Sequence, residues 1–160
     1  MKYRIETFGE FRLVGYKERM KFENGENFIR IPEFWKEISK EGKDKVLMEY
    51  NDHKDLCCLG VCTNGDEKGF DYYIATGSSK EITGDLKELI VPAHTFVIFE
   101  CVGKLPDAMQ NVWKTMFTEW FPSSDYTVVD GPQMEWYGPG DMDQDDYVSE
   151  IWIPVSKKEQ

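Results

Sequence analysis

Two glutamates, each standing two residues before an aromatic residue near the end of the chain, are the clearest candidates for chemistry. Glu135 precedes Tyr137, and Glu150 precedes Trp152. Side chains two positions apart in a strand share one face of the sheet, so each pair would place a carboxylate beside a ring. Such a site favours an organic cation, because rings attract cations and a desolvated carboxylate lacking an opposite charge is costly.

Strand alternation also predicts which face of the sheet these groups occupy. If the branched residues of 151–155 pack against a helix layer, Glu150 and Trp152 must face the other way. We expect the face turned away from the helices to hold Tyr73, Glu135, Tyr137, Glu150 and Trp152. The alternative is that these aromatics are ordinary core residues and the glutamates ordinary surface residues.

Other catalytic patterns are missing from the sequence. It has no nucleophile elbow, phosphate-binding glycine loop or zinc-protease helix. The two histidines and four cysteines do not have zinc-ligand spacing, and reduced structural thiols are expected. A pocket glutamate with a raised pKa could still activate water as a general base. A hydrolase using Glu135 or Glu150 therefore stays open, with no metal and no cofactor expected.

An acidic loop at residues 138–146 suggests a calcium site at first sight. Asp141, Asp143 and Asp145 have the alternating spacing of an EF-hand loop. That loop needs glycine at its sixth position and glutamate at its twelfth, where this chain has Asp146 and Trp152. We therefore expect no calcium site here.

Charge and composition exclude several classes of protein. The formal net charge is −11 and no basic run is present, which argues against direct nucleic-acid binding. No apolar run approaches the ~20 residues of a membrane span, and the mixed-charge start is not a signal peptide. We expect a cytoplasmic protein without membrane contact, whose acidic surface attracts cations.

The chain contains the same kind of unit twice, about 78 residues apart. At this offset residues 34–38 align with residues 112–116, and both segments have an apolar helical period. Residues 56–60 align with residues 134–138. We expect one domain over 1–160, with repeat halves at about 1–80 and 88–156, a pseudo-two-fold axis and a cleft at the seam between them.

Each half is expected to follow the order β-α-β-β, which gives an α+β fold with an antiparallel sheet and two main helices. The first helix is expected from Ile31, with Pro32 in its first turn and Gly42 ending it, and the second from about Pro106 to Phe121. Expected strands are 3–8, 11–20, 56–63, 70–76, 96–99, 133–137 and 148–155.

Six short motifs in this order resemble the GyrI-like (gyrase-inhibitor-like) small-molecule-binding domain over essentially the whole chain. They are Ile31-Pro32-x-x-Trp35, residues 71–75, residues 91–93 leading into 96–99, the Trp113 helix, Gly131-Pro132-x-x-Glu135-x-Tyr137, and residues 149–155. The resemblance implies two β-α-β-β units side by side, forming a cradle with the ligand at their seam.

In bacterial family members fused to DNA-binding domains, this module senses effectors for multidrug-responsive transcription regulators of the AraC and MerR types. The resemblance implies a pocket of aromatic residues with a central glutamate that holds lipophilic cations. That glutamate would be Glu135, with Glu150 as the alternative, and the lining would be Tyr73, Tyr137, Trp152 and Trp35.

The first repeat begins at once, so we expect a stand-alone member without a helix-turn-helix. Its expected function is binding an aromatic, cationic drug or toxin. Two alternatives remain: a hydrolase of reactive cyclopropane-bearing toxins, and a factor that acts on a protein partner such as gyrase.

Overall fold

The computed structural model describes residues 1–159. The chain forms two compact units, one made of Met1–Glu10 with the chain from Pro92 onward, the other of Phe11–Val91. We call these the outer unit and the inner unit, after their places in the sequence. No helix in the described part of the chain combines the length and the apolar character needed to cross a membrane.

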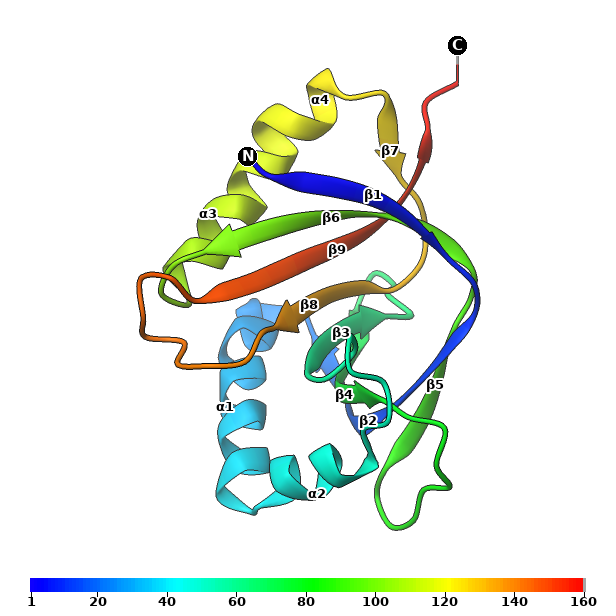
Figure 1. The fold of residues 1–160 in the computed structure, drawn as a ribbon, viewed down its shortest axis with the longest axis vertical. Coiled ribbons are helices and arrows are strands. Elements are labelled where there is room, and N and C mark those ends of the chain that lie inside the picture. The colour runs from blue at the N-terminus through cyan, green and yellow to red at the C-terminus, as the bar shows by residue number, and fades with distance from the viewer. Residues whose placement is uncertain (160) are drawn as a thin grey trace. The chain divides into compact units, whose positions relative to one another are not determined.

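The inner unit is a four-stranded antiparallel sheet with two helices (Figure 1). Its strands are β2 (Phe11–Lys21), β3 (Leu59–Thr63), β4 (Gly69–Gly77) and β5 (Lys87–Val91), in the order β3-β4-β2-β5. The short 3-10 turn η1 (Glu23–Gly25) leads into α1 (Glu26–Lys40), and α2 (Lys43–Tyr50) follows.

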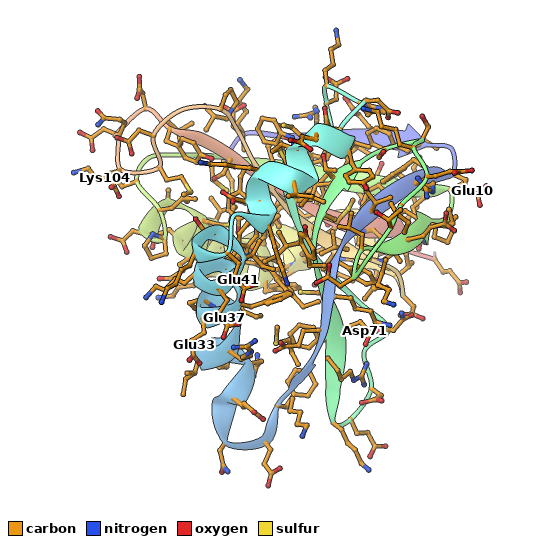
Figure 2. All side chains as sticks on the ribbon, turned by 90° about the horizontal axis from the view of Figure 1, so that it is seen from below. Glu10, Glu33, Glu37, Glu41, Asp71 and Lys104 are labelled. Atoms are coloured by element: carbon orange, nitrogen blue, oxygen red, sulfur yellow. The ribbon has the colours of Figure 1, made fainter. Side chains whose placement is uncertain are left out.

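Helix α1 begins five residues before the predicted start at Ile31, so Pro32 lies inside the helix rather than in its first turn. Its core side presents Phe34 and Ile38, whereas Glu33, Glu37 and Glu41 follow one another along the exposed side (Figure 2). Helix α2 was not predicted. It buries only Leu47, so its sequence shows no clear apolar period.

The strands of the outer unit are also antiparallel. Its strands are β1 (Tyr3–Phe8), β6 (His94–Val102), β7 (Tyr126–Val128), β8 (Gln133–Tyr137) and β9 (Val148–Lys157). Their order is β1-β6-β9-β8, with β7 also paired to β9. One continuous helical segment follows β6, made of α3 (Asp107–Thr115), a π-helical turn (Met116–Trp120) and α4 (Phe121–Ser123).

The two units have the same topology, which confirms the predicted α+β fold with a duplicated β-α-β-β order. In the inner unit β2 precedes the main helix and lies beside β4, and β3 lies on the other side of β4. In the outer unit β6 precedes the main helix and lies beside β9, and β8 lies on the other side of β9. The units differ from the expected halves at their edges. The first strand, β1, pairs with β6 of the outer unit, and β5 extends the inner sheet beside β2.

Each unit buries one sheet face under its helices. In the inner unit Val14, Tyr16, Tyr72 and Ile74 meet α1 and α2. In the outer unit α3 lies against β6 and β9 (Figure 1), and the core is built from Val97, Phe99, Cys101, Ile151, Ile153 and Val155. The prediction that Ile151, Ile153 and Val155 face the helix is therefore confirmed.

Strands β2 and β4 approach each other so closely at Gly15 that a side chain there would not fit. This glycine pairs with Ala75, and a Cβ at Gly15 would collide with the carbonyl oxygen of Ile74. We expect Gly15→Ala to lower the free energy of unfolding by about 1–3 kcal/mol, because the backbone must shift. Urea unfolding measures this. Gly9→Ala is the matched control, since its Cβ would meet open space, and an equal loss in both variants would contradict the packing described.

Candidate functional site

Glu135 is held between an aromatic residue of the helix and one of its own strand. It lies in β8 opposite Ile151 of β9, so its side chain points to the sheet face that α3 covers. The indole Nε1–H of Trp113 donates a hydrogen bond to Glu135 Oε2 at 3.1 Å. The hydroxyl of Tyr137 donates to Glu135 Oε1 at 3.4 Å. The two donors fix the carboxylate at the boundary between helix and sheet.

A pocket opens beside this carboxylate. Its volume is about 240 Å³, and it is lined by Leu105, Pro106, Met109, Gln110, Trp113, Glu135 and Tyr137. Met109 and Trp113 are four residues apart and therefore line the same side of α3. The walls are largely apolar, with the carboxylate of Glu135 as the acidic group among them. A small apolar pocket with one acidic group suits a cation with an organic substituent.

In the described part of the chain, Glu135 has no basic side chain as an ion-pair partner. Among residues 1–159, every ion pair involves other carboxylates. Burial raises the pKa of Glu135, and the hydrogen bonds from Trp113 and Tyr137 oppose this shift only in part. Burial thus disfavours the ionised form of Glu135, and perturbed carboxylates of this kind are typical of functional sites.

Glu150, the other candidate, is already neutralised. Arg4 of β1 contacts it through Nη1 at 2.8 Å and Nη2 at 3.4 Å, and Trp152 Nε1–H donates to it at 3.0 Å. Trp152 itself is buried, with its ring stacked on Phe8 at a centroid distance of 5.2 Å. A carboxylate with a bound guanidinium has little attraction left for a cationic ligand. The ion pair with Arg4 therefore compensates the charge of Glu150 within the protein.

The predicted sheet face was wrong for two of the five residues that were expected to share it. Glu150 and Trp152 do face away from the helix, as expected, but Glu135 and Tyr137 lie on the helix-covered face. Alternation correctly paired each glutamate with its aromatic neighbour. It predicted the wrong face of β8 to be covered, because Met134 and Trp136 are more apolar than Glu135 and Tyr137.

The two remaining candidates belong to the inner unit and lie on opposite faces of its sheet. Tyr73 is buried on the face away from the helices, with Lys17 Nζ 5.9 Å from its ring centroid. Trp35 of α1 lies on the helix side, where its Nε1–H donates to the Tyr72 hydroxyl at 2.7 Å. These two residues therefore do not share one wall of a pocket.

The inner unit repeats the tryptophan but not the carboxylate. Gly60 of β3 lies opposite Ile74, as Glu135 lies opposite Ile151. A Cβ at Gly60 would collide with the Tyr72 hydroxyl, which occupies that space and accepts the Trp35 hydrogen bond. The duplicated fold thus contains one acidic site and one neutral counterpart.

Sequence reasoning missed Trp113 and Met109 as site residues. Both lie on the apolar side of the predicted helix, where packing is the ordinary role of such residues. The repeat held a usable signal, because it aligns Trp113 with Trp35, which was a candidate. The partner Arg4 gave no signal, since its pairing with Glu150 spans 146 positions.

Comparisons with known proteins agree with this architecture. A family profile described as the GyrI-like small-molecule-binding domain matches residues 1–156. The structure of SAV2435 bound to tetraphenylphosphonium is similar with a TM-score of 0.85 and 25% identity, over 98% of this chain and 94% of that chain. No match to this chain is found among the curated proteins.

Two further solved structures are similar. A candidate transcription regulation protein from Staphylococcus aureus MU50 has a TM-score of 0.79 and 27% identity, over 97% of this chain and 98% of that chain. The EcmrR C-terminal domain has a TM-score of 0.66 and 17% identity, over 98% of each chain. At that identity the EcmrR likeness shows a shared fold alone.

Replacing Glu135 by glutamine should stabilise the ligand-free protein at neutral pH. Because burial raises the folded-state pKa of Glu135, the stability it contributes is present below its unfolded pKa of about 4.3 and is lost as the pH rises through the folded pKa. Glu135→Gln has no charge to bury. We expect it to have a higher free energy of unfolding than the wild type at about pH 7.5 and to converge with it near pH 4.

Urea titrations over this pH range measure the difference. The control is Glu119→Gln, which removes an exposed carboxylate on the same helical segment and should follow the wild type throughout. The quantity compared is the free energy of unfolding of Glu135→Gln minus that of the wild type. If this difference is smaller at neutral pH than at acid pH, Glu135 does not have a raised pKa in the folded protein.

Proposed function

The chain belongs to the GyrI-like small-molecule-binding domain family, and we propose that it binds lipophilic organic cations at Glu135. The single observation behind this proposal is the partly buried carboxylate of Glu135, which two aromatic residues hold in place and which no basic side chain of residues 1–159 neutralises. A cation entering the pocket would supply the missing charge.

The similar structure of SAV2435 with tetraphenylphosphonium supports this ligand class. Tetraphenylphosphonium has a single delocalised positive charge and four phenyl groups, with no hydrogen-bond donor. Recognition of such an ion depends on apolar area, ring faces and one negative charge. The pocket walls of Leu105, Met109 and Trp113 and the carboxylate of Glu135 provide these three features.

Selectivity for a cation over a neutral analogue follows from the same carboxylate. A neutral ligand would exclude water from Glu135 without compensating its charge, which penalises binding. A cation would gain the electrostatic attraction and lower the pKa of Glu135 toward its ordinary range. Binding and ionisation of Glu135 are therefore coupled.

Isothermal titration with tetraphenylphosphonium and with neutral triphenylphosphine oxide tests the proposal. We expect Glu135→Gln to weaken phosphonium binding by about tenfold to a hundredfold, or roughly 1.4–2.8 kcal/mol. Binding of the phosphine oxide should stay the same or improve, because the variant has no charge to desolvate.

Two matched variants make the result specific. Glu119→Gln changes net charge equally but lies on the exposed side of the helix, so phosphonium affinity should change less than about twofold. Glu150→Gln tests the alternative carboxylate. Equal phosphonium affinity in wild type and Glu135→Gln, with a loss in Glu150→Gln, would move the site to the other face of the sheet and reject the proposal.

A further inference from the structure

The pocket beside Glu135 is too small to enclose a cation with several aryl groups. Its volume of about 240 Å³ lies below the roughly 300–1,000 Å³ of pockets that surround drug-sized ligands. A polyaryl cation whose charge meets Glu135 must therefore leave part of its surface outside the pocket. The nearest exposed apolar surface decides how well that part binds.

A series of aromatic rings runs along the helix from the pocket wall. Trp113 and Phe117 are nearly parallel, with ring centroids 6.1 Å apart and an interplanar angle of 13°. Phe117 and Phe121 are stacked at 5.4 Å and 24°. Residues four apart are neighbours on a helix, so the three rings form one row whose first member, Trp113, holds Glu135.

Phe117 is the exposed member of this row. Its relative exposure is 49%, whereas Phe121 is 8% exposed and packs in the core. Phe117 lies in the π-helical turn Met116–Trp120, a distortion that is often found at functional sites. The ring of Phe117 stacks on both Trp113 and Phe121, and the part of the residue that these two rings leave uncovered is open to solvent.

We propose that Phe117 is an aryl-binding subsite outside the pocket, which makes the protein prefer polyaryl cations to compact ones. This inference rests on the proposed cation site at Glu135. The charged centre and one substituent occupy the pocket, and a second aryl group packs against the exposed ring of Phe117. Aromatic pairs contribute beyond their buried area, so the subsite adds affinity only for ligands long enough to reach it.

The test compares two cations of equal charge and different reach. Tetraphenylphosphonium is the polyaryl probe, and benzyltriethylammonium, with one ring, is the compact probe, measured by its displacement of tetraphenylphosphonium. Phe117→Ala should weaken the polyaryl probe by about three- to tenfold and change the compact probe by less than about twofold. Phe117→Leu keeps apolar volume without a ring and should behave like Phe117→Ala.

Phe28→Ala is the matched control, since it removes a phenyl group that is 80% exposed on α1 of the inner unit. It should leave both affinities unchanged. Thermal unfolding of each variant identifies any loss of the folded state.

Three results would overturn the subsite: unchanged phosphonium affinity in Phe117→Ala, an equal loss for both probes, or full affinity in Phe117→Leu. Failure of the cation site is seen separately. In that case Glu135→Gln binds both probes like the wild type, whatever Phe117→Ala does.

Discussion

The hydrogen bond between the Trp113 indole and the Glu135 carboxylate is the interaction on which the site depends. It joins α3 to β8 at 3.1 Å, and it fixes an acidic group among apolar side chains where water would otherwise be its main partner. A neutral donor satisfies part of the hydrogen-bonding capacity of a carboxylate but none of its charge. In the proposed function, this uncompensated charge would make a small apolar pocket selective for cations.

The duplicated fold shows how this site could arise without altering the scaffold. Both units place a tryptophan of the main helix against the sheet, and in both its indole N–H finds an oxygen acceptor. In the inner unit the acceptor is the neutral Tyr72 hydroxyl above Gly60, and in the outer unit it is Glu135. The same helix-to-sheet contact therefore serves packing in one unit and charge placement in the other.

The sequence predicted the order of elements because the strands alternate and the long helices have a clear period. The sequence did not predict α2, which buries only Leu47. The predicted start of α1 was too late in the chain, because Pro32 was taken to lie in the first turn. Alternation paired Glu135 with Tyr137 but predicted the wrong face of β8 to be covered, since the more apolar pair, Met134 and Trp136, lies on the face away from the helix. The neutralisation of Glu150 by Arg4 joins the two ends of the chain, and no local pattern encodes it.

The central claim is that the Glu135 carboxylate lacks a compensating charge until a cation binds. The pKa of Glu135 measures this most directly. Carboxyl carbon NMR with labelled glutamate, assigned by Glu135→Gln, would follow its titration with and without tetraphenylphosphonium. The account predicts a pKa above the ordinary glutamate value of about 4.3 in the free protein and a lower pKa when the ligand is bound. An ordinary pKa in the free protein that the ligand leaves unchanged would contradict it.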